Sequence, residues 1–168
     1  GSLSPKSAWP ILVYGLPSLG LRIREQTQAA GRIARFLEDH PKIDRVAYPG
    51  LDTFPQKDLV SRQMVDFEGR FMPGNMIYFV LKGTPASRGR KAEKLVDAVA
   101  NQAYTITLAV SLGQIRTLIE RPTSMTHAVV PEETKEAGHI DPGGIRLSVG
   151  IEETADIIKD LTHALNAV

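Results

Sequence analysis

Cysteine is absent from the 168 residues, and histidine and tryptophan are scarce, with four and one residues. The absence of cysteine excludes disulfides, thiolate metal ligands and cysteine nucleophiles. It is also consistent with the reducing cytoplasm, where we expect this protein to act. The length suits one domain with its own hydrophobic core. We interpret Gly1-Ser2 as a cloning remnant, which leaves residues 3–168 as a single domain.

An excess of charge and a long apolar run are also lacking. Twenty Lys and Arg residues against 19 Asp and Glu residues give a net charge of +1. No overall field therefore attracts nucleic acid or an anionic membrane, and no segment approaches the length of a membrane span. We expect neither partner. One basic cluster has no interleaved aromatic residues, and its pattern is typical of a solvated helix face: Arg88, Arg90, Lys91 and Lys94.

The common catalytic signatures are missing as well. The sequence has no glycine-rich phosphate loop of standard spacing and no arrangement that suggests a catalytic triad. The histidines have no metal-ligand spacing, and a structural role is the favoured interpretation of each: His40, His127, His139 and His163. The adjacent Glu152 and Glu153 diverge on a helix, where we expect capping and dipole roles. We predict no metal site.

Hydrophobic periodicity predicts an α+β fold with a small, mostly antiparallel or mixed sheet and helices on one face. We expect a helix from an N-cap at Ser18 to about His40, a helix within residues 87–103 and a final helix from about Glu153 to Ala167. The expected strands are residues 43–48, 76–81, 105–110, 115–120 and 145–149. The predicted buried faces of the three helices are Leu19, Ile23, Ala30, Ile33, Ala34 and Leu37, then Leu95, Val96, Val99 and Ala100, and finally Ile157, Ile158, Leu161, Ala164 and Leu165.

The segment "GGIRLSVGIEE" raises a question about Arg146. Its strand alternation places Ile145 and Leu147 on one face and Arg146 and Ser148 on the other. Simple exposure to water is the favoured interpretation of the pattern alone. The alternative is that the planar guanidinium holds a carboxylate through two parallel hydrogen bonds.

Two other places could contribute to a site. Ser111, in "AVSLGQ", follows a predicted strand and could add a hydroxyl or backbone donor. Thr126 and His127 lie in a long, irregular connection, where binding residues tend to collect.

Taken together, "TLAVSLGQIRTLIERPTSMTH", "GGIRLSVGIEETADIIKDL" and "LSPKSAWPILVYGLPSLGLRIREQ" resemble the carboxy-terminal region of the Cys/Met-metabolism pyridoxal-phosphate enzymes. This family includes cystathionine γ-synthase, cystathionine lyases, methionine γ-lyase and the O-acylhomoserine sulfhydrylases. The resemblance extends from Leu3 to Ala167. It implies the C-terminal domain of the aspartate-aminotransferase-like type I fold, with its open sheet face toward the cofactor domain.

The resemblance also implies roles for individual residues. Arg146 would bind the substrate α-carboxylate, with Ser111 and Leu112 beside it. The parent enzyme would be a homo-oligomer, expected to be a tetramer. It would act on an amino-acid substrate, either by γ-replacement on O-acylhomoserine or by β/γ-elimination from cystathionine or methionine. Of these reactions we favour γ-replacement. Pyridoxal 5'-phosphate would be held elsewhere, because the sequence has no S-x-T-K motif of the kind that carries the family's cofactor lysine. We therefore expect the chain alone to be inactive.

Some positions depart from the family pattern. Gln114 stands where a second glycine is usual, and Arg116 where an acidic residue is usual. Both put the local loop geometry in question. Two alternatives from other classes remain: a ferredoxin-like module that senses an amino acid, and a structural domain whose sheet face pairs with another chain.

Overall fold

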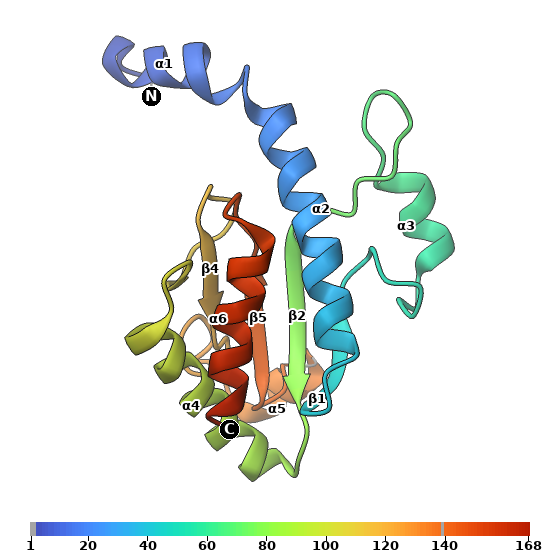
Figure 1. The fold of residues 1–168 in the computed structure, drawn as a ribbon, viewed down its shortest axis with the longest axis vertical. Coiled ribbons are helices and arrows are strands. Elements are labelled where there is room, and N and C mark those ends of the chain that lie inside the picture. Colours follow the sequence, from blue (N-terminus) through green and yellow to red (C-terminus); the bar gives the residue numbers. More distant parts are fainter. Residues whose placement is uncertain (1–2, 139) are drawn as a thin grey trace.

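The computed structural model describes residues 3–138 and 140–168, so Gly1-Ser2 and His139 lie outside the described residues. A five-stranded sheet with the order β1-β2-β5-β4-β3 forms the centre of the fold (Figure 1). Only β3 and β4 run parallel; the other neighbouring strands are antiparallel. The sheet is therefore mixed, as predicted. Its strands are β1 Ile43–Ala47, β2 Met76–Leu81, β3 Ile106–Leu108, β4 Thr117–Glu120 and β5 Gly144–Ser148.

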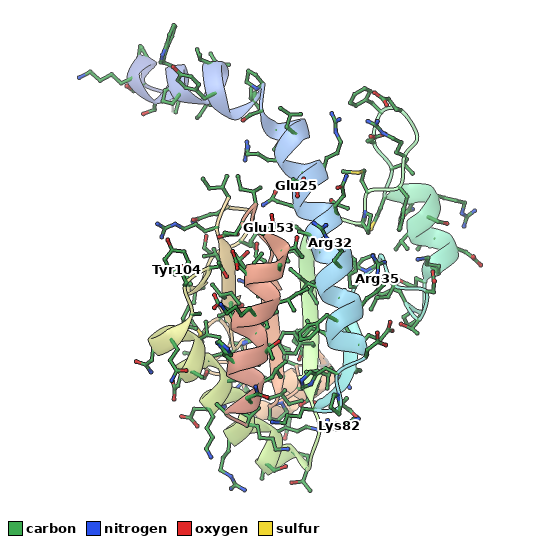
Figure 2. All side chains as sticks on the ribbon, viewed as in Figure 1. Glu25, Arg32, Arg35, Lys82, Tyr104 and Glu153 are labelled. Atoms are coloured by element: carbon green, nitrogen blue, oxygen red, sulfur yellow. The ribbon has the colours of Figure 1, made fainter. Side chains whose placement is uncertain are left out.

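Three long helices cover one face of the sheet: α2 Leu19–Glu38, α4 Pro85–Gln102 and α6 Thr154–Asn166. Helix α6 packs against both α2 and α4, and Figure 1 shows α6 directly over the sheet. Arg32 on α2 donates to the Thr154 hydroxyl at the start of α6 (2.7 Å), beside Glu153 (Figure 2). The remaining helices are short: α1 Pro5–Pro10, the π-helical turn η1 Ile11–Gly15, α3 Lys57–Gln63 and α5 Glu132–Ala137.

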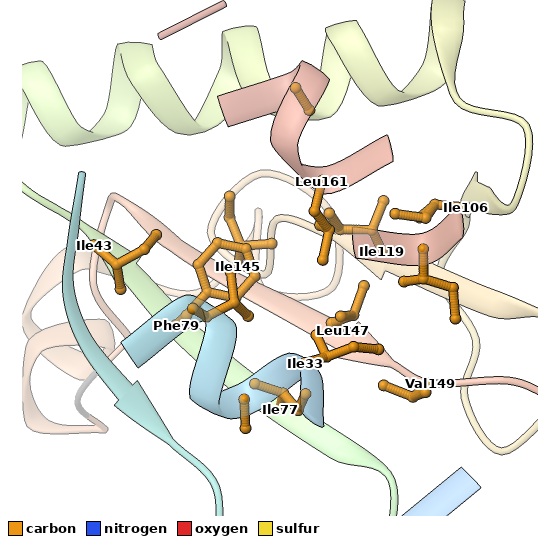
Figure 3. Close-up of a cluster of buried hydrophobic side chains, with 14 of the residues drawn as sticks. Ile33, Ile43, Ile77, Phe79, Ile106, Ile119, Ile145, Leu147, Val149 and Leu161 are labelled. Atoms are coloured by element: carbon orange, nitrogen blue, oxygen red, sulfur yellow. The ribbon is translucent and has the colours of Figure 1, made fainter. Parts of the chain in front are cut away.

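The hydrophobic core lies between the sheet and these three helices (Figure 3). Alternate residues of β2 and β5 supply its sheet side, because successive side chains of a strand point to opposite faces. Ile145 and Leu147 are fully buried there, as the alternation predicted. From the predicted helix faces, Ala100 is exposed instead of buried, because it lies on the outer side of α4.

The first turn of α2 and the segment before it extend beyond the core. Leu19 is 42% exposed and Ile23 is only partly buried, so the predicted buried face of this helix is wrong at its start. The arm formed by α1 and η1 projects away from the sheet, and its side chains stand apart from the rest of the molecule (Figures 1 and 2). None of the residues of α1 is buried, and Trp9, Leu12 and Tyr14 are each more than 60% exposed. The apolar residues at the start of α2 have helical periodicity, but this part of the helix projects beyond the sheet.

The helix ends differ in how they are capped. Ser18 occupies the N-cap position of α2, yet its hydroxyl donates to the Tyr14 carbonyl and caps nothing. Glu153 holds the N-cap position of α6 without a side-chain bond, while Glu152 accepts hydrogen bonds from the backbone N–H and the hydroxyl of Thr117 (2.8 Å each). Ser18 and Glu153 therefore occupy N-cap positions, but the predicted capping by their side chains is wrong. The predicted dipole role of Glu152 and Glu153 stays a prediction. Glu152 fastens the start of α6 to β4.

Tyr48 brings a polar group into the core. Its side chain is fully buried, and the hydroxyl lies 2.9 Å from the Gly74 carbonyl, to which it donates. Burial disfavours the charged phenolate and raises the pKa of Tyr48 to about 12.

Candidate functional site

The sheet face opposite the three helices carries a row of polar side chains. Strand register places Tyr78 of β2 and Glu120 of β4 directly on either side of Arg146 of β5. Three strands that are distant in the sequence thus bring a phenol, a guanidinium and a carboxylate together. Cross-strand neighbours of this kind lie close enough to interact.

Arg146 is held by two acceptors. Its Nη1 lies 2.9 Å from Oε1 of Glu120, and its Nη2 donates to the Ser111 carbonyl at 3.1 Å. The Arg146 side chain is 23% exposed, and that of Glu120 only 1%. Simple exposure, which the pattern alone favours, is therefore wrong for Arg146. Within the described residues, these two acceptors engage two of its five N–H groups.

A cavity of about 360 Å³ opens beside this row. We call it the Arg146 hollow. Its polar lining residues are Arg146, His127, Tyr78 and Glu120. It is lined by Tyr78, Glu120, Pro122, His127, Gly138, Ile140 and Arg146. A hollow of this volume can accommodate a small organic anion.

Tyr78 is kept in place by a glycine and by the start of β5. A Cβ atom on Gly144 would overlap the phenol oxygen of Tyr78, so only glycine leaves room for the ring. The phenol oxygen accepts a hydrogen bond from the Asp141 backbone N–H (3.1 Å). Burial raises the pKa of Tyr78, and the negative charge of Asp141 adds to this effect. Tyr78 therefore keeps its proton to a higher pH than a tyrosine in water.

Asp141 also anchors the end of the long connection between β4 and β5. Its carboxylate pairs with Arg88 at 2.8 Å, and Arg88 reaches Asp44 at 2.9 Å. The predicted solvated face is therefore wrong for Arg88, whose side chain is 19% exposed. Arg90 and Lys94 are exposed, as expected.

The loop of residues 109–116 brings Ser111 next to Arg146. Gly113 has a φ of 71° there, a conformation that glycine adopts without strain. Ser148 accepts from the Gly113 N–H (3.0 Å), and Gln26 on α2 donates to the Gln114 carbonyl (2.7 Å). The loop is therefore fastened from two sides although Gln114 departs from the family pattern.

Ser111 meets Arg146 through its carbonyl, not through its hydroxyl. The hydroxyl accepts from the Gln114 side chain at 3.2 Å, which leaves its own O–H to donate. Neither Ser111 nor Leu112 lines the Arg146 hollow, and Leu112 is 57% exposed.

Of the two residues singled out in the long connection, one lines the hollow and the other contacts a lining residue. His127 lines it, and Thr126 donates to Oε1 of Glu120 at 3.3 Å. Glu120 itself had no sequence signal beyond its place at the end of a predicted strand. Elsewhere His40 has the expected structural role, since its ring nitrogen accepts from the Lys42 N–H (3.2 Å), and His163 is exposed.

Other kinds of site find no support in the part of the chain that the structure describes. Within residues 3–138 and 140–168, no group of three His, Asp or Glu side chains could hold a metal ion. In the same residues no helix is both long and apolar enough to cross a membrane.

The Arg146 hollow suits a carboxylate, but it does not suit the anchoring of a carbonyl cofactor. Among the described residues that line it, none is a lysine, so no amine is available there to form a covalent bond with an aldehyde. A guanidinium with free N–H groups is the group that binds a planar carboxylate best.

Comparisons with known proteins identify the class. The structure superposes on cystathionine gamma synthase from Xanthomonas oryzae pv. oryzae, solved in complex with cystathionine, with a TM-score of 0.81 and 36% identity, over 98% of this chain and 38% of that one. The fold is thus that of the C-terminal domain of type I pyridoxal-phosphate enzymes. The sequence matches the family described as Cys/Met metabolism PLP-dependent enzyme over residues 1–166, and the chain belongs to this family.

Two curated relatives extend this result. The chain is 38% identical to an L-methionine gamma-lyase of Porphyromonas gingivalis over 167 residues, and 36% identical to a cystathionine gamma-lyase of Bacillus subtilis over 168 residues. These alignments cover 99% and 100% of the chain but only 38% and 40% of the relatives. The family match supports the interpretation as a domain of a pyridoxal-phosphate enzyme over the amino-acid-sensing module and the structural domain.

Proposed function

We propose that this chain is the substrate-side C-terminal domain of a pyridoxal-phosphate enzyme of sulfur amino-acid metabolism, and that Arg146 binds the substrate α-carboxylate. The parent enzyme would act by γ-replacement on an O-acylhomoserine or by β/γ-elimination from cystathionine or methionine. The relatives named as gamma-lyases and the superposed gamma synthase support this range of reactions.

One observation carries the proposal. The Arg146 side chain, three-quarters buried, lines a hollow of about 360 Å³, and within the described residues Glu120 and the Ser111 carbonyl engage two of its five N–H groups. Glu120 and the Ser111 carbonyl fix its plane, so a carboxylate would meet a donor that is already oriented. Ser111 could add its hydroxyl as a further donor once the loop adjusts.

The cofactor would be held by residues other than these, since no lysine is among the described residues that line the hollow. When bound, pyridoxal phosphate supplies the electron sink for a carbanion at the substrate Cα. The contribution of this chain is orientation: Arg146 fixes the carboxylate and thereby the direction of the Cα–H bond. We propose that the chain alone does not catalyse the reaction.

Nuclear magnetic resonance titration of the 168-residue chain tests the role of Arg146. L-Methionine should shift the signals of Arg146 and residues 111–114, while L-methioninamide, which lacks the carboxylate, should shift them at least about tenfold less effectively. Arg146→Gln should remove this preference. Arg146→Lys should not restore it, because a lysine lacks the fork that binds both oxygens.

An equal response to L-methionine and its amide would contradict the proposal, as would an unchanged preference in folded Arg146→Gln. Arg90→Gln is the matched control, since Arg90 is an exposed arginine outside the hollow, and it should leave the titration unchanged.

The cofactor part has a separate test. The chain is mixed with pyridoxal phosphate, reduced with borohydride, and digested for peptide mass analysis. We expect no stoichiometric adduct at any single lysine. A stoichiometric adduct at one lysine would mean that this chain binds the cofactor in its own way.

We further propose that the parent assembles as a homo-oligomer, expected to be a tetramer. The exposed Trp9, Leu12 and Tyr14 of the arm support this, because exposed apolar patches mark interaction surfaces. Sedimentation of the parent enzyme tests it, and a monomer would contradict it.

A further inference from the structure

The proposed function uses Glu120 only as one of the two acceptors that orient Arg146. Glu120 lies at the end of β4, paired in register with Arg146, and its carboxylate is 1% exposed. Its Oε1 accepts from Arg146 Nη1 at 2.9 Å and from the Thr126 hydroxyl at 3.3 Å. Its Oε2 is buried and has no hydrogen-bond partner among the described residues.

Such a carboxylate is not explained by stability alone. Removing a charge from water is costly, and a buried ion pair often adds little to folding compared with apolar residues of the same size. The orphaned Oε2 adds to this cost. The pair does have a geometric effect, because Glu120 and the Ser111 carbonyl hold the two ends of one guanidinium.

Glu120 also connects Arg146 to the long connection that borders the hollow. Thr126 shares Oε1 with Arg146, and the Thr126 hydroxyl lies 2.9 Å from the Nδ1 of His127, a lining residue of the hollow. One carboxylate oxygen therefore sets the relative position of the guanidinium and the imidazole.

We propose that Glu120 is a positioning residue for Arg146. Glu120 fixes the plane of the Arg146 guanidinium and offsets its positive charge. The hollow therefore selects a carboxylate by the direction of hydrogen bonds and not by net electrostatic attraction. This inference rests on the proposed role of Arg146 in binding the α-carboxylate. Because the pair is neutral as a whole, hydrogen-bond direction decides what binds. An anion without the planar carboxylate shape gains little in this hollow.

The positioning role is tested first without any ligand. In ¹⁵N-arginine spectra of the 168-residue chain, the Nη protons of Arg146 should give separate, slowly exchanging signals, because two acceptors restrict rotation of the guanidinium. Glu120→Ala should merge these signals and speed their exchange. Persistence of separate, slow signals in Glu120→Ala would overturn the proposal.

The selectivity is tested by the ratio of the dissociation constants for L-methioninamide and L-methionine. Glu120→Ala should lower this ratio at least about tenfold, since the guanidinium is no longer aligned. Glu120→Gln keeps an acceptor of the same shape and removes the charge, so it should bind inorganic phosphate at least about threefold more tightly than the wild type. An unchanged ratio in the first variant, or unchanged phosphate affinity in the second, would overturn the proposal.

Asp160→Asn is the matched control. Asp160 on α6, across the sheet, accepts from the Thr105 N–H and hydroxyl (2.7 Å each), so its loss should affect stability and leave the ratio of dissociation constants and the phosphate affinity unchanged. The two proposals fail differently. If the wild type shows no preference for the carboxylate, the proposed function fails. If the wild type shows the preference and Glu120→Ala retains it, only the positioning role fails.

Discussion

The two faces of one strand in this protein serve different purposes. Ile145 and Leu147 of β5 point into the core beneath the helices, and Arg146, between them, lines the Arg146 hollow on the opposite face. On the covered face, apolar area removed from water stabilises the fold. On the open face, buried polar atoms form hydrogen bonds or ion pairs, as for the Ser148 hydroxyl and Oε1 of Glu120, while Oε2 of Glu120 is buried without a partner among the described residues. The difference indicates that the apolar packing on the covered face stabilises the strand that holds the polar groups of the open face in position.

The largest effect is expected from the covered face. Leu147→Ala should lower the free energy of unfolding by about 2 to 5 kcal/mol, because Leu147 is fully buried and the cavity cannot close completely. Urea denaturation measures this loss. A loss below about 1 kcal/mol would show that the core around β5 can rearrange.

Alkaline pH should reveal the polar group within the covered face. The pKa of Tyr48 is raised to about 12, so between pH 10 and about 12 the folded chain keeps a proton that the unfolded chain releases. Stability conferred by this group is complete below pH 10 and falls as pH rises, by about 2 to 3 kcal/mol in total. Tyr48→Phe should flatten this fall in urea titrations across that range. An equally steep fall in Tyr48→Phe would assign it to other groups.

Gly144 links the open face to strand pairing. Gly144→Ala should destabilise the fold by about 1 to 3 kcal/mol, because its Cβ would overlap Tyr78. Tyr78→Leu in the same chain should recover part of the loss, since the shorter side chain vacates that space. A double-mutant cycle measured by thermal denaturation gives the coupling, and strict additivity of the two changes would contradict the overlap.

The smallest stability change is expected from Ser148, the neighbour of Leu147 on the open face. Ser148→Ala should cost about 1 kcal/mol, the typical contribution of one hydrogen bond, here to the Gly113 N–H. Amide hydrogen exchange should instead show a clear local effect, with faster exchange in residues 111–116. If this exchange is unchanged, Ser148 does not hold the loop.

Elements with strong local periodicity could be predicted from the sequence. The strand at residues 76–81 was located correctly at both ends, and the alternation around Arg146 assigned Ile145 and Leu147 to the core. Helical periodicity also located α2, but its first buried positions were wrong. Leu19 is apolar and has the helical spacing of a buried position. Local periodicity does not indicate how far the sheet extends under the helix, so it could not predict that Leu19 lies beyond the core.

The candidate site could be predicted only in part. The resemblance singled out Arg146 and Ser111, and the structure brings them into contact. The partner of Arg146 is Glu120, and this pairing depends on strand order, which periodicity does not determine. The same holds for Arg88, whose ion pair with Asp141 joins α4 to the start of β5.

The close approach of Tyr78 to Gly144 has an evolutionary consequence. A lineage that gains any side chain at position 144 must first exchange the phenol at position 78 for a smaller group, because the reverse order passes through a destabilised intermediate. The two positions should therefore change together among relatives, with a fixed order of substitution. Tyr78 also lines the Arg146 hollow. A substitution at position 144 of β5 should therefore come with a change in the shape of the site.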